Sequence, residues 1–223
     1  MMNRFVKRVL DILFVRPCII CGKPVKTSDE INLCADCDNA VHQYGQTVSV
    51  PGRIVISVLP YEKYIRRAMF RFKFGNKKYY GYTFGELIYK RIKQFDWHEN
   101  IDCVVCVPMK GRDRMYNQAA VIAGHVSCRM GIPFEENVLV KIKDNPPFYR
   151  LGKNERLKLV KGAFDICDNN SIRDKRILLI DDIYTTGATI GECRRVLMMN
   201  GAAEVFCVTA CYGVLGKGKS VIK

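Results

Sequence analysis

Residues 177–189 read ILLIDDIYTTGAT, and this stretch decides the fold predicted for the chain. Four aliphatic residues without a polar break, Ile177 to Ile180, are typical of a strand that is buried on both faces, as in the centre of a parallel sheet. Asp181 and Asp182 follow directly, so we expect them at the carboxyl end of that strand, where open α/β sheets bind their ligands. The stretch therefore predicts an α/β fold with a ligand site at this end of the sheet.

A small, hydroxyl-rich turn follows the two acids and leads into a helical pattern from Ile190 to Met199. Backbone N–H groups, threonine hydroxyls and a helix N-terminus can all donate to one phosphate group. The turn consists of Thr185, Thr186, Gly187, Ala188 and Thr189. The paired acids suit sugar hydroxyls, a Mg²⁺ ion or both. The pattern is neither a Walker loop nor a G-x-G-x-x-G fingerprint, and the alternative interpretation is a core strand that ends in an acidic turn.

Length and charge narrow the class of protein. The chain has 223 residues, of which 48% are hydrophobic, enough for one α/β domain and a small accessory module. Lys and Arg outnumber Asp and Glu by 36 to 22, and the net charge of +14 favours a polyanionic partner over a basic but otherwise ordinary cytoplasmic protein. Residues 1–15 show no secretory signal and no apolar run reaches membrane-spanning length, so we expect a cytoplasmic protein without a membrane span.

Two Cys-x-x-Cys pairs near the N-terminus predict a metal site. The four residues are Cys18, Cys21, Cys34 and Cys37. Two pairs at this spacing suit one tetrahedral Zn²⁺, and four thiolates leave no open position for a catalytic water, so we expect a structural metal. A redox dithiol or plain buried cysteines are the alternatives. We place a domain boundary near the turn at Pro51, between an N-terminal module of residues 1–50 and a larger domain of residues 51–223.

The segment from Tyr61 to Tyr80 combines apolar residues at helical spacing with seven cations against Glu62 alone. Cations that hold phosphates and exposed rings that stack on bases would together bind single-stranded nucleic acid. Alternatively, the rings are core and the cations only solvate the outer face of a helix, and the sequence does not decide between the two interpretations. The candidate nucleic-acid residues are Arg66, Arg67, Arg71, Lys73, Lys77 and Lys78.

A second buried strand is predicted from Ile101 to Val107, followed by a basic loop. Cys103 and Cys106 are at an odd spacing on this strand, which sends their side chains to opposite faces and argues against a second metal site. Because the loop comes at a strand end, where α/β sites form, it is a candidate for holding a second anionic group. Its residues are Pro108, Met109, Lys110, Gly111, Arg112 and Arg114.

The motifs together resemble a known family. The strand, the Asp-Asp pair and Thr-Thr-Gly-Ala-Thr resemble the phosphoribosyl-pyrophosphate (PRPP) motif of type I phosphoribosyltransferases. The order along nearly the whole chain is similar to that of the ComF family of competence-associated proteins: four cysteines, Val107-Pro108, Arg114-x-x-Asn117-Gln118, Arg156, Gly162-Ala163-Phe164 and then the PRPP motif. The resemblance implies a type I phosphoribosyltransferase-like parallel sheet flanked by helices, with a small N-terminal zinc-binding module.

The resemblance also implies ligands and roles. The 185–189 turn would hold the 5′-phosphate of PRPP, Asp181 and Asp182 the ribose hydroxyls, and the 108–111 loop the pyrophosphate with Mg²⁺, under a mobile hood of about residues 143–161. A ComF-family protein would handle single-stranded DNA in natural transformation, with a DNA-uptake helicase as a candidate partner. The alternative function is an active phosphoribosyltransferase, similar to the amidophosphoribosyltransferases, which transfers the phosphoribosyl group to an unidentified acceptor. We favour the first because nothing in the sequence identifies a pocket for a nucleobase or amine acceptor.

Overall fold

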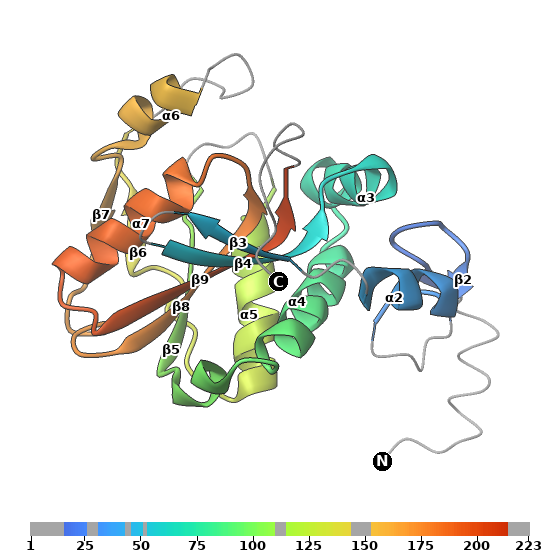
Figure 1. Cartoon of the computed structure of the whole chain (residues 1–223), viewed down its shortest axis with the longest axis horizontal. Coiled ribbons are helices and arrows are strands. Elements are labelled where there is room, and N and C mark those ends of the chain that lie inside the picture. Colours follow the sequence, from blue (N-terminus) through green and yellow to red (C-terminus); the bar gives the residue numbers. More distant parts are fainter. Residues whose placement is uncertain are drawn as a thin grey trace.

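The computed structural model describes residues 16–25, 31–42, 46–50, 53–109, 115–143 and 153–213. Its centre is a five-stranded sheet in the order β3-β4-β9-β8-β5 (Figure 1). The strands are β3 (Gln46–Val50), β4 (Arg53–Pro60), β5 (Cys103–Cys106), β8 (Arg176–Tyr184) and β9 (Glu204–Tyr212). β3 runs antiparallel to β4, and the other neighbouring strands are parallel. The predicted α/β class with a parallel sheet is therefore confirmed.

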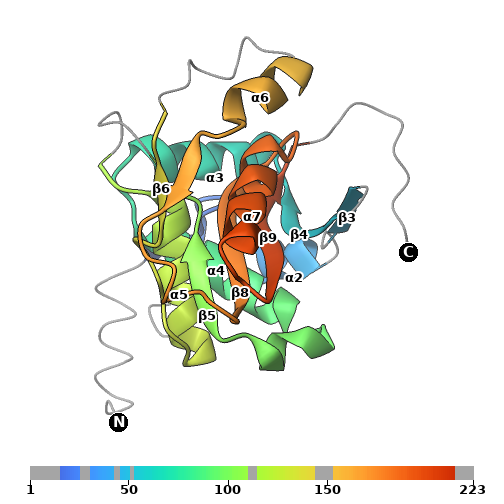
Figure 2. The ribbon, with the colours of Figure 1, turned by 90° about the vertical axis from the view of Figure 1, so that its left-hand side faces the viewer.

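Helices cover both faces of the sheet (Figure 2). α4 (Tyr79–Ile92) and α5 (Gln118–Met130) pack on one face, and α7 (Ala188–Met199) packs on the other. Leu178 and Ile180 of β8 belong to the first hydrophobic layer, whereas Ile177 and Leu179 belong to the second, and all four are fully buried. The aliphatic run at 177–180 is thus a central strand with two buried faces, as the sequence predicts.

The second predicted strand is shorter than expected. β5 begins at Cys103 and ends at Cys106, where Val107 N still donates to Ile180 O at 2.9 Å before Pro108, which has no N–H, ends the pairing. Cys103 packs in the α7 layer and Cys106 in the α4–α5 layer. The two thiols therefore point to opposite faces of the sheet, as predicted.

The segment from Tyr61 to Tyr80, in which apolar residues recur at helical spacing, contains a break between two helices. α3 covers Lys63–Phe74 and ends at Gly75, and α4 already begins at Tyr79. Gly75 lies close to the helix, since a Cβ built on it would come within 2.5 Å of Arg71 O. Residues 75–78 read Gly-Asn-Lys-Lys and contain no apolar side chain, so the apolar spacing stops at the break.

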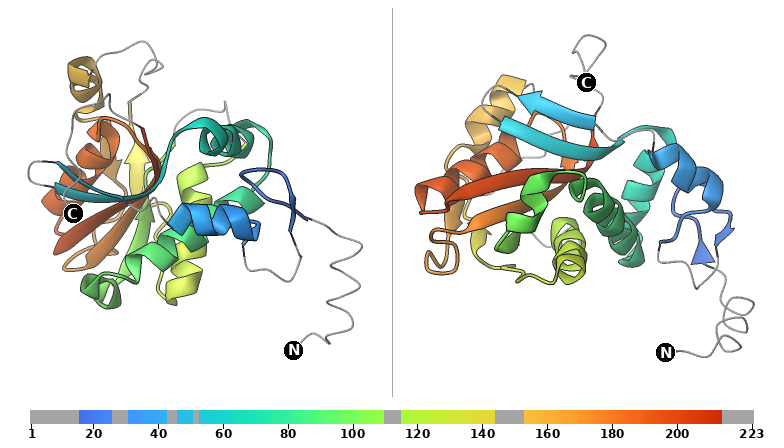
Figure 3. Two further views of the ribbon diagram at one scale, coloured as in Figure 1. Left: turned by 45° about the vertical axis from the view of Figure 1, so that its right-hand side comes forward. Right: turned by 60° about the horizontal axis from the view of Figure 1, so that its bottom comes forward.

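The N-terminal module packs beside α4 (Figure 3). It contains β1 (Arg16–Pro17), β2 (Pro24–Val25) and α2 (Ala35–His42). Asn32 N donates to Thr83 Oγ1 at 3.2 Å, and Ile19 and Leu33 share a buried cluster with α4. The boundary near residue 50 stays a prediction; β3, which precedes it, pairs along its whole length with β4.

A small sheet of β6 (Leu139–Lys141) and β7 (Phe164–Ile166) flanks the main sheet, with α6 (Lys153–Val160) between its strands in sequence. A short 3₁₀ helix, η1 (Asp96–Asn100), precedes β5. Over the part of the chain that the structure describes, we find no helix long and apolar enough to cross a bilayer.

Candidate functional site

Asp181 and Asp182 lie on a part of β8 that extends past the end of β5. β5 pairs with β8 only up to Cys106 and Ile180, whereas β9 continues beside β8 as far as Tyr184. Both carboxylates are half-buried, and Asp182 N donates to Asp181 Oδ1 at 2.8 Å. The strand is therefore longer than the sequence predicts, and the acids are part of it, on a stretch that β5 no longer borders.

The turn from Thr185 to Gly187 connects β8 to the N-terminus of α7. Gly187 has a φ of 74° and precedes the helix, and Gly191 N donates to Gly187 O at 2.9 Å. Thr185 is exposed, Thr186 and Thr189 are half-buried, and the first turn of α7 contains no acidic side chain. A helix N-terminus whose first turn contains no carboxylate carries a partial positive charge that an anion can use.

A cation that the sequence analysis assigned elsewhere contacts this site. Lys73 Nζ of α3 lies 2.6 Å from Asp182 Oδ2, and both side chains are only 14% exposed. Lys73 follows the buried Met69 by four residues, which places it beside the apolar stripe of α3, but nothing in the sequence indicates which acid it faces. The fold supplies that information by laying α3 near the carboxyl end of β8.

The loop after β5 begins next to the same strand end. Pro108 and Met109 are half-buried, whereas Lys110, Gly111, Arg112 and Arg114 lie outside the described residues, as do 144–152 of the predicted hood. Asn117 connects the two described ends of the loop. Its Nδ2 donates to Val107 O, before the loop, at 3.0 Å, and its Oδ1 accepts from Ala119 N, after the loop, at 3.0 Å. The described ends of the loop are thus held close to β8, and the role of the loop stays a prediction.

Four cysteines of the N-terminal module form a cluster that fits one metal ion. The sulfur atoms of Cys18, Cys21, Cys34 and Cys37 all lie within 4.8 Å of one another. Tetrahedral coordination with metal–sulfur bonds of about 2.3 Å separates the sulfurs by about 3.8 Å, close to the 3.5 Å between Cys21 Sγ and Cys34 Sγ. Burial raises the pKa of Cys18, but backbone N–H donors, first that of Cys21, outweigh it and lower the pKa to about 7. Burial raises the pKa of Cys21 and that of Cys37, so the fit to a metal ion rests on the short distances among the four sulfur atoms.

Comparison with known proteins decides the family. Residues 83–221 match the model of the phosphoribosyl transferase domain, which includes β5, the acids of β8 and the turn before α7. The chain belongs to the phosphoribosyl transferase domain family.

Three curated relatives of this phosphoribosyl transferase-domain protein narrow the assignment. Competence protein F of Haemophilus influenzae is 30% identical over 142 residues, which cover 60% of this chain and 62% of that protein, less than two thirds of its length. DNA utilization protein YhgH of Salmonella typhimurium is 22% identical, covering 86% of this chain and 88% of the relative. Competence protein ComFC of Streptococcus pneumoniae is 25% identical, covering 84% and 96%. With the four-cysteine cluster, these relatives confirm the predicted membership of the ComF family.

The chain presents a second surface on α3, which precedes the matched domain in sequence and which we call the outer face of α3. Its residues are Tyr64, Arg66, Arg67, Phe70, Arg71 and Phe74, and all six are exposed. Tyr64, Phe70 and Phe74 are 55%, 61% and 58% exposed, whereas Ile65, Ala68, Met69 and Phe72 point into the core. The sequence left open whether the rings are core or surface. The structure shows that α3 has both kinds, on different faces.

Rings and guanidinium groups on the outer face of α3 contact one another. The Phe70 and Phe74 centroids are 4.9 Å apart, and Arg67 lies over the Tyr64 ring at 6.0 Å. A hollow of about 570 Å³ is lined by Tyr61, Lys63, Arg66, Arg67, Phe70 and Arg71. Lys78, another predicted nucleic-acid residue, is exposed and lies over the Tyr116 ring at 5.5 Å, and Lys77 is half-buried. Of the candidate cations, Lys73 forms an ion pair with Asp182.

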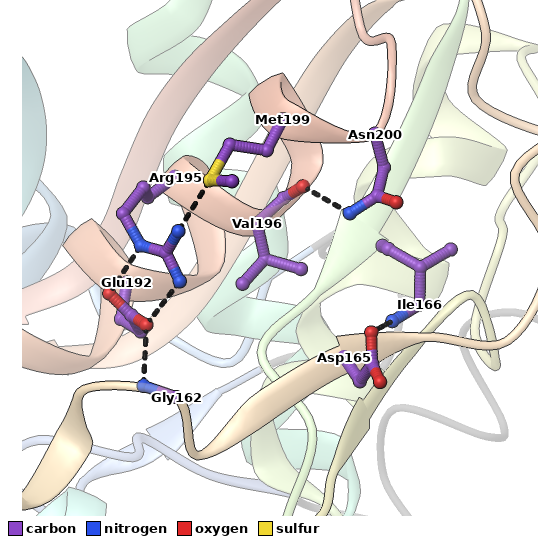
Figure 4. A network of polar contacts seen from close by, with 8 residues as sticks. All are labelled: Gly162, Asp165, Ile166, Glu192, Arg195, Val196, Met199 and Asn200. Carbon is purple, nitrogen blue, oxygen red and sulfur yellow. Dashed lines mark hydrogen bonds and ion pairs between the residues drawn. The ribbon is translucent and has the colours of Figure 1, made fainter.

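α7 is tied to the chain that follows α6 by a carboxylate that sequence reasoning missed (Figure 4). Gly162 N donates to Glu192 Oε1 at 2.7 Å, and Arg195 donates to both oxygens, from Nη2 at 2.7 Å and from Nε at 2.9 Å. The Arg195 guanidinium is the main cause of a lowered pKa of Glu192, with a smaller contribution from Gly162 N–H against the opposing effect of burial. Glu192 therefore links the α6–β7 connection to the helix that begins at the candidate phosphate turn.

Proposed function

We propose that this ComF-family protein binds PRPP, or a closely related phosphoribosyl ligand, with Mg²⁺, and that it handles single-stranded DNA in the cytoplasm. The observation that carries the first part is the placing of two carboxylates and a helix N-terminus on one strand end, in a chain of the phosphoribosyl transferase domain family. Acceptors for sugar hydroxyls and donors for a phosphate are then next to each other, as a phosphorylated pentose requires.

The proposed roles follow the chemistry of each group. Asp181 and Asp182 accept hydrogen bonds from the ribose hydroxyls, and the donors of the 185–189 turn hold the 5′-phosphate. The loop from Pro108 to Gly111, with Mg²⁺, is proposed to hold the pyrophosphate. Mg²⁺ would supply charge neutralisation there, and the chain's own part is to orient the sugar phosphate and hold its oxygens.

Single-stranded DNA is proposed to bind on the outer face of α3. Bases stack on exposed rings with little sequence preference, and cations between the rings neutralise the phosphates. The exposure of Tyr64, Phe70 and Phe74 beside three arginines supports this proposal. The names of the relatives, two competence proteins and a DNA utilization protein, point the same way. A DNA-uptake helicase remains the predicted partner.

For the four-cysteine cluster we propose a structural Zn²⁺. Four sulfurs at mutual distances below 4.8 Å suit a closed tetrahedral site. Such a site stabilises a small module whose strands β1 and β2 contain only two residues each.

The phosphoribosyl site is tested with a double variant, Asp181→Asn with Asp182→Asn. We expect it to lose calorimetric binding of PRPP with Mg²⁺ while its zinc content is unchanged. Asp165→Asn serves as the matched control, because Asp165 is an exposed acid on β7. Unchanged PRPP affinity in the double variant would rule out this site. Release of pyrophosphate from PRPP with candidate acceptors separates a transferase from a protein that only binds the ligand.

The DNA surface is tested with Phe70→Ala and a fluorescent oligothymidine. Loss of one stacked base costs about 1–3 kcal/mol, so affinity should fall roughly fivefold to 150-fold. Tyr82→Ala is the matched control, because Tyr82 of α4 is 51% exposed and lies outside the outer face of α3. Equal affinity of both variants and the wild type, or binding that is insensitive to salt, contradicts the proposal.

A further inference from the structure

The Lys73–Asp182 ion pair lies between the two proposed ligand sites. We infer that single-stranded DNA on the outer face of α3 and a phosphoribosyl ligand at Asp181 and Asp182 bind with positive cooperativity, because each ligand separates Lys73 from Asp182 and thereby favours the other. This inference rests on the proposed function and adds a regulation of the same sites that neither ligand alone would reveal.

Lys73 borders both sites by its position on α3. It follows Phe70 by three residues and Arg66 by seven, so it lies on the same flank of the helix as these two members of the outer face. Its Nζ nevertheless reaches Asp182 Oδ2 at 2.6 Å, with only 14% of either side chain exposed. The flexible Lys73 side chain starts beside Arg66 and Phe70. Its ammonium group can therefore contact either Asp182 or a phosphate bound along α3.

At the phosphoribosyl site the ion pair opposes ligand binding. The sugar hydroxyls need carboxylate oxygens as acceptors, and one oxygen of Asp182 already accepts from Lys73. A pair that is largely withdrawn from water interacts more strongly than an exposed surface pair. The phosphoribosyl ligand must therefore loosen the pair before it can use Asp182 fully.

At the outer face of α3 the same ion pair keeps the Lys73 ammonium group away from a bound DNA phosphate. Lys73 carries one of the five positive charges of α3, which contains no acidic residue. Each lysine or arginine that joins a single-stranded phosphate backbone steepens the dependence of log K on log salt by about 0.7. When a phosphoribosyl ligand frees Lys73, DNA gains this contact without the cost of breaking the pair, and linkage makes the effect reciprocal.

The backbone of α3 is held independently of this pair. Tyr116 donates from its hydroxyl to Phe72 O, and the Tyr116 and Phe72 rings pack with centroids 5.6 Å apart. Phe72 itself is fully buried. The coupling therefore depends on the Lys73 side chain, and a substitution of that side chain should leave α3 in place.

The test measures binding of a fluorescent oligothymidine to the full chain at several salt concentrations, with and without saturating PRPP and Mg²⁺. We expect PRPP to raise the DNA affinity at least about fivefold, the lower end of typical coupling, and to steepen the salt dependence by about 0.7. Calorimetry should show the same factor for PRPP when DNA is present. Equal or weaker DNA binding with PRPP, as repulsion between two anions would give, overturns the inference.

Lys73→Met removes the charge and keeps the length of the stem, and Lys73→Gln is a second variant. In both, each ligand should still bind, while the coupling factor falls to about one and PRPP no longer changes the salt slope. Lys78→Met is the control, because Lys78 is a cation of the same segment that lies over Tyr116 and should leave the coupling intact. If both ligands bind the wild type without coupling, or if Lys73→Met keeps it, the inference fails and the proposed function stands. If either ligand does not bind at all, both fail.

Discussion

Gly187 packs directly against Tyr184, three residues before it, where β8 turns into α7. A Cβ built on Gly187 would lie 2.8 Å from both Cε2 and the hydroxyl oxygen of Tyr184, whose side chain is buried. Gly187 also has a φ of 74°, in the left-handed region that L side chains rarely adopt. The closed shape of the candidate phosphate turn therefore depends on the absence of a side chain at this position.

Gly187→Ala should weaken both stability and ligand binding. The strained backbone and the contact with the Tyr184 ring together predict a loss of about 1–3 kcal/mol in the free energy of unfolding, measured with urea. Because the turn would open, PRPP affinity in calorimetry should fall about tenfold or more.

The matched control for this change is Gly124→Ala in the interior of α5. The nearest atoms to a new Cβ there are two carbons of the Phe134 ring at 3.7 Å, an ordinary contact. Alanine is the better helix former, so this variant should be neutral or stabilised by up to about 1 kcal/mol. Equal effects of the two alanine substitutions would contradict the account of the turn.

Cys37→Ser should remove the metal from the N-terminal module. The purified wild-type chain is expected to release one Zn²⁺ on treatment with a thiol-blocking reagent, and the variant none, as measured with a colorimetric chelator. Loss of the metal should unfold the module, which packs on α4 through Thr83, and lower the protection of α4 amides from hydrogen exchange.

Cys128→Ser is the control for the metal prediction. Cys128 is an exposed thiol on α5 and is not part of the four-cysteine cluster. The Cys128→Ser substitution should leave the zinc content unchanged. Full zinc content in Cys37→Ser would mean that the cluster is not the metal site.

The central part of the fold could be predicted from the sequence because it depends on local patterns. An unbroken aliphatic run at 177–180 indicates a strand with two buried faces. Two Cys-x-x-Cys pairs predict a cluster because four thiolates at that spacing have few other uses. Such signals need no knowledge of which segments meet in space.

The contacts that the sequence could not supply are those between distant segments. Lys73 and Asp182 are 109 positions apart, and nothing in the sequence distinguishes Lys73 from the other cations of α3. The alternation of buried and exposed rings along α3 was equally undetermined, since Phe72 points into the core whereas Phe70 and Phe74 point out. Only the packing of α3 on the α4–α5 layer decides which face is outward.

Glu192→Gln should destabilise the protein in a pH-dependent way. The pKa of Glu192 is lowered in the folded state by Arg195 and by Gly162 N–H, so its ionised form stabilises the fold above the unfolded pKa of about 4.3, and this contribution is lost as the pH falls through the folded pKa. At pH 7 the variant should lose about 1–2 kcal/mol in the free energy of unfolding by urea, and the difference from the wild type should shrink below about pH 4.

Glu204→Gln is the matched control for Glu192→Gln. The Glu204 carboxylate is 49% exposed and lies 3.3 Å from Arg176, so this variant should lose less than about 1 kcal/mol. A loss in Glu192→Gln that is the same at pH 3.5 and pH 7 would show that the charge of Glu192 does not hold α7 to the α6–β7 connection.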